Sequence, residues 1–276
     1  MRGNIDRFKE INKDDTMEAM TISDPIVRKA LDVIQLNGWR LREMLYKWSA
    51  DRIRGAVPDD KLHDADEPRS AITHADIMVH TAVVEAFADE LVTIIAEEGI
   101  VEKPNARYRI VLDDLDGTYN ASRGVLGRSA VSLAIDEQVG GAFLPLAGMW
   151  YNPYFDEAVV GVRGCGVWYR CEGKEMPVGR IESPVTLSRS RIITGSTGAT
   201  NDPRSKMWNL PLSILAGKIL APLNYESSVV SLVDVALSRA EGFVVAGNKA
   251  WDLWSARTIF RELGIPYAFF TECWRR

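Results

Sequence analysis

Three aspartates stand close together in the segment VLDDLDGTYN, residues 111–120, where Asp113, Asp114 and Asp116 precede a Gly-Thr pair. The run YRIVL before them has the composition of a strand, which would place the carboxylates at its carboxyl end. Converging carboxylates repel one another unless cations or protons intervene. Oxygen ligands suit Mg²⁺ or Mn²⁺, and two such ions can clamp a phosphoryl group. The segment therefore indicates phosphoryl-transfer chemistry, with an ordinary acidic turn as the alternative.

The two residues after the aspartates fit the same chemistry. Gly117 permits a tight turn, and Thr118 can begin a helix. The first N–H groups of a helix have no partner within it and point towards an anion.

The segment resembles the first motif of two phosphatase families. Haloacid dehalogenase-type phosphatases carry D-x-D-G-T after a strand, here Asp114 to Thr118, with the first aspartate as nucleophile. The inositol monophosphatase superfamily carries D-P-[IL]-D-G-[TS]-x-N, here read from Asp113 to Asn120. In that second frame Asp114 replaces the proline of the family.

The flanking sequence favours the second family. The dehalogenase family has its motif near the start of the core, whereas here the motif lies more than a third of the way along the chain. That family also has a later pair of acids, and we find no such pair in this sequence. The monophosphatase family instead has further motifs in a fixed order. These are THAD with Thr73 and Asp76, IIAEEG with Glu97 and Glu98, a YNP…DE…G-x-G hairpin from Tyr151 to Gly166, and WD…E-x-G with Trp251, Asp252, Glu262 and Gly264. The chain thus resembles the inositol monophosphatase and fructose-1,6-bisphosphatase-like superfamily.

The resemblance implies an α+β fold, a layered α/β/α/β/α sandwich, and a magnesium centre. One Mg²⁺ would be held by Glu97, Asp113 and the Leu115 carbonyl. A second would be held by Asp113, Asp116 and Asp252. A third, loosely bound ion near Glu97 is a family tendency, and Mn²⁺ is an alternative metal.

The resemblance also implies roles in catalysis and substrate binding. Glu97, Thr118, Thr73 and Asp76 would orient the attacking water, and the N–H groups of Gly117 and Thr118 would bind phosphate. Ser227 and Ser228 open a helix that contacts substrate in the family. The expected reaction is hydrolysis of a small polyol, sugar or nucleotide phosphate by a metal-activated water. The alternatives are a dehalogenase-type phosphatase with Asp114 as nucleophile, or a relative that binds ligand without turnover.

The chain departs from the family pattern at several positions. Asp114 replaces the proline, and we expect its side chain to point into solvent. Glu226 replaces a glycine that precedes the serines, and Val245 replaces a glutamate of inositol-specific members. Trp254 replaces a small alanine and would crowd the metal pocket or stack on a substrate. Inositol phosphate is therefore in doubt as the substrate.

The elements that must position these residues follow from hydrophobic spacing. A helix is predicted from Asp24 and Pro25, with Ile26, Ala30, Ile34, Leu41, Leu45 and Trp48 on one face and a break near Gly38. A second is predicted from Thr73 to Glu97, with a stripe of Ile77, Val84, Phe87, Leu91 and Ile94. Strands follow between residues 108 and 170, with RGCG as a hairpin turn.

The last part of the sequence alternates strands and helices. Helices are expected around Lys206–Ala216 and Ser227–Ala240 and from Asp252 to Leu263, with a strand GFVVAG between the last two. We expect two subdomains, residues 1–182 and 183–276.

Composition narrows the class of protein. The 276 residues are 46% hydrophobic and 26% charged, which is ordinary for a globular chain, and the net charge of −5 argues against a general nucleic-acid binder. The three cysteines and three histidines show no metal-ligand spacing. No segment resembles a leader or a membrane span. We expect a soluble, cytoplasmic homodimer whose partner is a small phosphorylated metabolite.

Overall fold

A computed structural model describes residues 22–54, 61–63, 71–179, 186–194, 213–215, 217–225, 227–245 and 248–268. Its centre is an eight-stranded sheet in the order β10-β9-β8-β7-β6-β5-β3-β4. The bounds are β3 Val92–Ala96, β4 Gly99–Val101, β5 Tyr108–Asp116, β6 Ala130–Val139, β7 Ala142–Asn152, β8 Glu157–Val162, β9 Gly166–Cys171 and β10 Lys174–Pro177. Most neighbours are antiparallel, but β3 and β5 run parallel.

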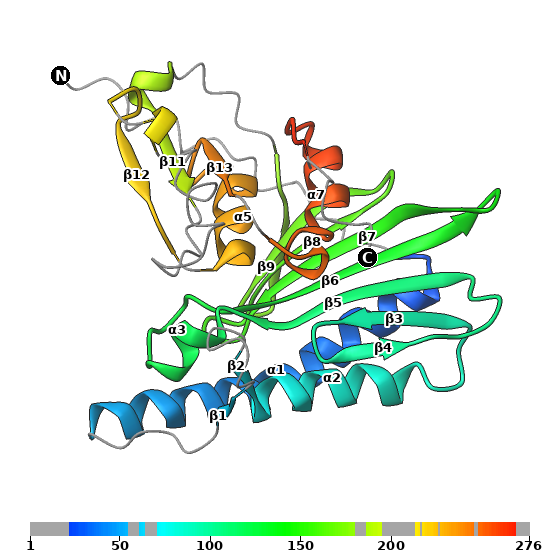
Figure 1. The fold of residues 1–276 in the computed structure, drawn as a ribbon. Helices are drawn as coiled ribbons and strands as arrows, with labels where there is room; N and C mark the ends of the chain where they lie inside the picture. The colour runs from blue at the N-terminus through cyan, green and yellow to red at the C-terminus, as the bar shows by residue number, and fades with distance from the viewer. Residues whose placement is uncertain are drawn as a thin grey trace.

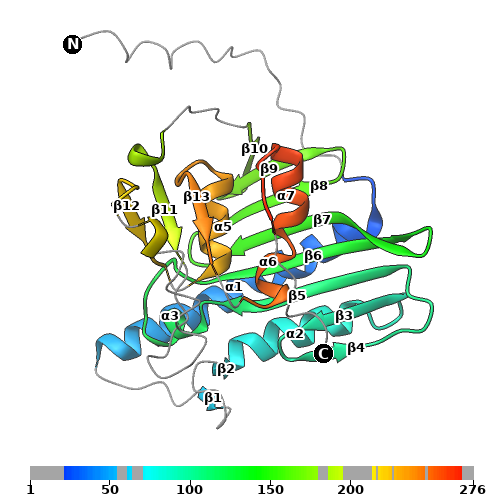
Figure 2. The ribbon, with the colours of Figure 1, turned by 45° about the horizontal axis from the view of Figure 1, so that its top comes forward.

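Helices cover both faces of this sheet (Figure 1). On one face lie α1 (Pro25–Ile53) and α2 (His74–Ala86). On the other lie α5 (Ser228–Ala236), α6 (Ala250–Leu253) and α7 (Ala256–Leu263), as Figure 2 shows. Beyond α5 is a parallel three-stranded sheet of β12 (Ala221–Leu223), β11 (Arg191–Thr194) and β13 (Gly242–Val244). The described layers are thus helix, sheet, helix and sheet.

Three short elements complete the described chain. They are the hairpin of β1 (Lys61–His63) with β2 (Ala71–Thr73), the helix α3 (Thr118–Ser122) and a 3₁₀ turn at Leu187–Arg189. Of the helix expected around Lys206–Ala216, only residues 213–215 are described, and Glu226 also lies outside the described residues.

The first helix forms as predicted but does not break. Asp24 caps its start by accepting hydrogen bonds from the N–H groups of Ile26 and Val27, and Pro25 occupies the first turn. Every residue of the predicted apolar face is buried. Gly38 allows close packing instead of a break, because a Cβ there would lie 2.1 Å from the Tyr151 hydroxyl.

The second predicted helix is wrong in its length and its face. α2 ends at Ala86, and residues 92–96 form strand β3 instead. The predicted stripe residues Ile77 and Leu91 are 40% and 59% exposed. β3 contains the β-branched run Val-Thr-Ile-Ile and pairs in parallel with β5, so sheet formation prevails over the apparent helical period. Glu97 and Glu98 therefore follow a strand, not a helix.

The last predicted helix is interrupted. It forms as α6 and α7, with Trp254 and Ser255 between them. Ser255 is fully buried, and its hydroxyl lies 2.7 Å from the Ser132 hydroxyl and 2.5 Å from Nε1 of Trp150. These bonds hold the junction between the two helices against β6 and β7.

Two hydrophobic clusters lie on the two faces of the large sheet. One packs α1 and α2 against residues such as Leu112 and Leu133, and the other packs α5 and α7 against residues such as Trp150. No helix among the described residues is long and apolar enough to cross a membrane. The predicted domain boundary at residues 182–183 lies outside the described residues and stays a prediction.

Candidate active site

The parallel pairing of β3 with β5 brings two acidic pairs together. Ala96 is in register with Leu112, so Glu97 and Glu98 leave β3 beside the Asp113-Asp114 pair. Asp113 is 2% exposed and Asp114 is 0% exposed. Because successive side chains of a strand point to opposite faces, these two aspartates belong to different environments. Asp113 faces Asp252 of α6, and Asp114 faces His80 of α2.

Asp113 is a buried carboxylate among other carboxylates. Its Oδ1 atom has no hydrogen-bond partner among the described residues. Burial raises the pKa of Asp113 well above its usual range, and the charges of Asp116, Asp252 and Glu97 raise it further. A buried carboxylate with one unpartnered oxygen and like charges around it calls for a cation or a proton.

Asp116 ends β5 after a register shift between Asp113 and Asp116 in the pairing with β6. Its Oδ2 atom accepts a hydrogen bond of 2.6 Å from the Ser227 hydroxyl and another of 2.6 Å from the Val229 N–H. Burial raises the pKa of Asp116 to about 6, although these two hydrogen bonds lower it. The side chain is therefore held in one orientation by the start of α5.

Asp252 reaches the same place from α6. Its carboxylate accepts a 2.9 Å hydrogen bond from the Lys249 N–H, as part of a capping arrangement at the start of the helix. Burial raises the pKa of Asp252 to about 7, and the charge of Asp116 adds to this effect. Asp116 and Asp252, which are 136 positions apart in the chain, thus lie close enough for their charges to interact.

Glu97 lies at the exposed edge of the group. Its charge contributes to the raised pKa of Asp113, Asp116 and Asp252, so the four carboxylates lie within electrostatic range of one another. The donor set is entirely oxygen, includes a buried atom without a partner and carries excess negative charge. These residues fit magnesium or manganese ions.

A second set of predicted residues forms a hydrogen-bonded network beside this group. Thr73 caps α2, and its N–H and its hydroxyl donate to Oδ2 of Asp76 at 2.7 and 2.5 Å. The Thr118 hydroxyl lies 2.7 Å from the Leu115 carbonyl and 3.4 Å from Oδ1 of Asp76. Burial raises the pKa of Asp76 to about 7, and the Thr73 hydrogen bonds oppose this shift. Thr118 therefore links Asp76 to the loop that carries Leu115.

Gly117 turns the chain from β5 into α3. Its φ of +80° is left-handed, and a Cβ at this position would lie 2.4 Å from the Arg128 carbonyl oxygen. The sequence prediction of a glycine turn followed by a helix at Thr118 is confirmed.

The predicted substrate residues have partners of their own. Ser227 caps α5 and donates to Asp116, so its hydroxyl positions a carboxylate. The Ser228 hydroxyl accepts a hydrogen bond from the Asn248 side chain. Trp254 donates a 3.0 Å hydrogen bond from Nε1 to Asp136 and lies against Arg257, and its expected role of crowding the metal pocket or stacking on a substrate stays a prediction.

The expectation that Asp114 points into solvent is wrong. Its side chain is fully buried, with Oδ2 3.5 Å from Nδ1 of His80. Sequence reasoning missed this contact because it requires α2 to cross β5. The available signal was the spacing of Asp76 and His80, which are four residues apart and lie on one face of a helix.

Comparison with solved structures identifies the class of fold. The suhB protein of Bartonella henselae has a TM-score of 0.67 and 22% identity, with 85% of this chain and 84% of that chain covered. An IMPase of Thermotoga maritima has a TM-score of 0.61 and 21% identity, with coverage of 86% and 84%. The predicted fold, a layered α+β sandwich of the inositol monophosphatase type, is confirmed.

The sequence identifies the family within that class. The model of the Inositol monophosphatase family matches residues 42–275, so the chain belongs to this family. An inositol-1-monophosphatase of Mesorhizobium japonicum is 29% identical over 171 residues, which are 62% of this chain and 60% of that protein. A Nus factor SuhB of Pasteurella multocida is 28% identical over 203 residues, 70% of this chain and 69% of that protein. Members of this family are metal-dependent phosphomonoesterases.

Proposed function

We propose that this protein is a Mg²⁺-dependent phosphomonoesterase that hydrolyses a small polyol, sugar or nucleotide phosphate. The observation that carries the proposal is the convergence of Asp113, Asp116 and Asp252. Each of these carboxylates has a pKa raised by burial, and none forms an ion pair with a lysine or arginine among the described residues. Such a group fits divalent cations better than a purely structural role.

The metal ligands would divide as the family pattern implies. Glu97, Asp113 and the Leu115 carbonyl would hold one ion, and Asp113, Asp116 and Asp252 would hold a second; Mn²⁺ is an alternative to Mg²⁺. Bound at these residues, the ions would neutralise charge on the phosphoryl oxygens and would lower the pKa of a water.

The other residues would orient the reacting groups. The N–H groups of Gly117 and Thr118 would contact phosphate oxygens at the start of α3. The Thr118 hydroxyl, 3.4 Å from Oδ1 of Asp76, would align the attacking water together with Glu97. Asp76 would help to orient the same water through the Thr118 hydroxyl, and Thr73 would hold Asp76 in position by the hydrogen bonds described above.

We propose a broad substrate class because the residues expected to bind substrate differ from the family pattern. The Ser227 hydroxyl is used to orient Asp116, which leaves Ser228 as the serine nearer to solvent at the start of α5. Val245 supplies no polar group where inositol-specific members carry glutamate. We therefore propose that the substrate is one of several classes of small phosphomonoester and is not restricted to inositol phosphate.

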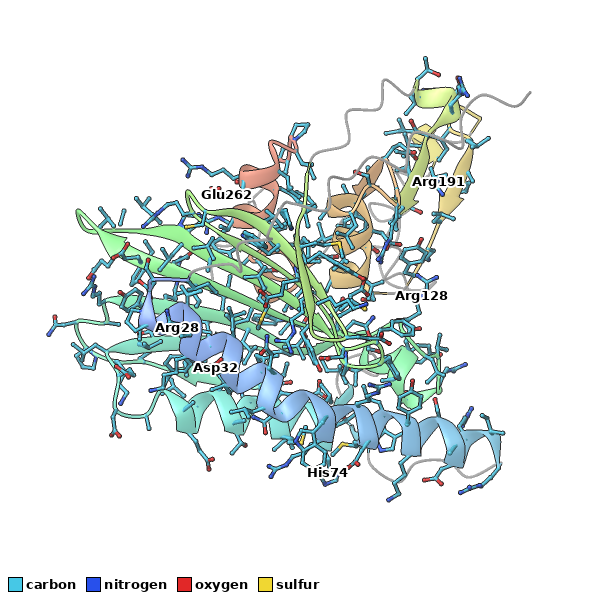
Figure 3. All side chains as sticks on the ribbon, turned by 180° about the vertical axis from the view of Figure 1, so that it is seen from behind. Arg28, Asp32, His74, Arg128, Arg191 and Glu262 are labelled. Carbon is cyan, nitrogen blue, oxygen red and sulfur yellow. The ribbon has the colours of Figure 1, made fainter. Side chains whose placement is uncertain are left out.

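The test is phosphate release from a panel of phosphomonoesters with and without Mg²⁺. Asp252→Asn should lower kcat/KM by roughly 100-fold or more, because it removes a metal ligand. Asp32→Asn is the matched control, since Asp32 is an exposed acid on α1 (Figure 3) and should leave turnover unchanged. Activity that persists in EDTA and in Asp252→Asn would refute the proposal. Loss only in Asp114→Asn would instead mark Asp114 as a nucleophile.

Two outcomes would refine the proposal. A folded protein that binds Mg²⁺ but releases no phosphate from any substrate would be a relative that binds ligand without turnover. The proposed homodimer is tested separately, by the molar mass in solution measured with light scattering.

A further inference from the structure

A second cluster of metal-ligating side chains lies on the other side of β5 from Asp113. His80 of α2, Glu98 after β3 and Asp114 of β5 each offer one ligand atom, and these atoms lie within 4.8 Å of one another. Nδ1 of His80 is 3.5 Å from Oδ2 of Asp114. The cluster joins the helix layer to two adjacent strands of the sheet.

The buried polar atoms of this cluster are unpartnered. Asp114 is 0% exposed, and apart from the neighbouring Glu98 carboxyl neither of its carboxylate oxygens has a hydrogen-bond donor among the described residues. Nδ1 of His80 and Oε2 of Glu98 likewise have no hydrogen-bond partner within the described part of the chain. Buried polar groups are nearly always satisfied, and an unpaired buried charge is costly. Atoms that converge without partners point to a ligand between them.

The charge of the cluster indicates what the ligand is. With both carboxylates ionised, as metal ligands are, the cluster carries two negative charges from Glu98 and Asp114. Among the described residues no lysine or arginine forms an ion pair with either of them. A divalent cation would neutralise the site and satisfy the unpartnered atoms together.

The donor atoms separate this cluster from the candidate active site. The active-site carboxylates and the Leu115 carbonyl are all hard oxygen donors, which suit Mg²⁺. An imidazole nitrogen with two carboxylates suits Zn²⁺ and related transition metals, with solvent completing the coordination. We propose that His80, Glu98 and Asp114 form a separate binding site for a divalent transition metal such as Zn²⁺.

The position of the site gives the metal a structural consequence. His80 lies one turn after Asp76 on α2, while Glu98 and Asp114 directly follow the active-site residues Glu97 and Asp113 in the chain. A metal bound to all three would cross-link α2 to the ends of β3 and β5. It would therefore fix the backbone from which the active-site carboxylates project.

The experiment measures metal content rather than turnover. Protein stripped with a chelator is dialysed against Zn²⁺ in saturating Mg²⁺, and bound zinc is counted by plasma mass spectrometry. Wild type should bind about one zinc ion per chain more than His80→Ala or Asp114→Asn. Zinc should also raise the melting temperature of wild type but not of these variants. His74→Ala, an exposed histidine in the first turn of the same helix, is the matched control and should keep the zinc.

Further variants distinguish this site from the active site and from a simple proton. Asp252→Asn should keep the zinc, because Asp252 lies on the other face of β5. Burial, and after it the neighbouring Asp114 carboxylate, raise the pKa of Glu98 to about 9. A proton shared by Glu98 and Asp114 is therefore the alternative to a metal ion in this site. Equal zinc uptake by wild type and by folded His80→Ala, or loss of zinc in Asp252→Asn, would overturn the proposal. Because zinc is counted directly, a protein without phosphatase activity still tests it.

Discussion

The Ser227 hydroxyl donates a 2.6 Å hydrogen bond to Oδ2 of Asp116 across 111 residues of chain. The same carboxylate oxygen accepts the Val229 N–H at 2.6 Å, so the first turn of α5 holds the end of β5. One oxygen of Asp116 is thereby occupied by the C-terminal part of the chain. Any metal that Asp116 binds depends on this contact for the orientation of its ligand.

Ser227→Ala is expected to lower kcat/KM roughly tenfold to 100-fold, because partners of metal ligands set their orientation. The free energy of unfolding should fall by about 1–3 kcal/mol, since the change removes the cap of α5 and a buried hydrogen bond. Steady-state kinetics and urea denaturation measure both effects. Ser231→Ala is the control: its buried hydroxyl bonds to the Ser227 carbonyl and not to Asp116, so stability should fall while kcat/KM is kept. Equal kcat/KM in both variants would contradict the positioning role.

Gly117→Ala should impair both folding and catalysis. A left-handed φ costs a non-glycine residue about 1–2 kcal/mol, and the new Cβ would also lie 2.4 Å from the Arg128 carbonyl oxygen. Gly140→Ala is the matched control, because its φ is +59° but nothing lies within 4 Å of a Cβ. Thermal denaturation should show a larger loss for Gly117→Ala, and only this variant should lose phosphate release. Equal melting temperatures would argue against the steric constraint.

Gly148→Ala tests how α6 and α7 are placed on the sheet. A Cβ on Gly148 would lie 2.1 Å from the Ser255 carbonyl oxygen, so the helix junction must move away from β7. Overpacking of this kind costs about 1–3 kcal/mol, and here it also displaces Asp252. We expect reduced affinity for Mg²⁺, measured by titration calorimetry. Gly179→Ala, where a Cβ meets nothing within 4 Å, should leave both stability and Mg²⁺ affinity unchanged.

The stability of the metal-free protein should fall as the pH rises. Burial raises the pKa of Asp252 from 3.8 to about 7 and that of Asp116 from 3.8 to about 6. Between the ordinary pKa of 3.8 and the raised value, the folded state holds a proton that the unfolded state has released. The free energy of unfolding that these groups contribute below pH 4 is therefore lost as the pH approaches 7. Each such group contributes about 1.4 kcal/mol per pH unit in that window.

The effect is measured as the melting temperature in EDTA at about pH 4.5 to 8, a range that covers the window between the ordinary and the raised pKa values. Mg²⁺ should flatten the curve, because bound ions replace the protons as counter-charge. Asp252→Asn should have a shallower slope than wild type in EDTA. A melting temperature in EDTA that rises with pH across the window would contradict the raised pKa values.

Several features of the fold follow directly from local sequence. Asp24 and Pro25 start α1 because a side-chain cap and a fixed φ act within a few residues. The hairpin turn RGCG between β8 and β9 was predicted for the same reason. The structure adds that Glu262 of α7 (Figure 3) accepts 3.1 Å hydrogen bonds from the N–H groups of Gly164 and Gly166, which joins two separate family motifs.

Other features were decided by partners distant in the chain. Residues 92–96 have the spacing of a helix, but they complete the sheet because β5 offers a parallel partner. Trp254 follows the WD motif and was expected near the metal pocket. In the structure its ring contacts Asp136 and Arg257, and neither contact has a signal in the local sequence.

The sequence by itself determined the family and the set of acidic residues, because motif order and residue type are properties of the chain. Only the tertiary structure decided which acids share a site. Asp113 and Asp114 are neighbours in sequence, yet strand alternation sends one towards Asp252 and the other towards His80. That separation depends on which helix packs on each face of β5, and such packing arises from contacts between residues far apart in the chain.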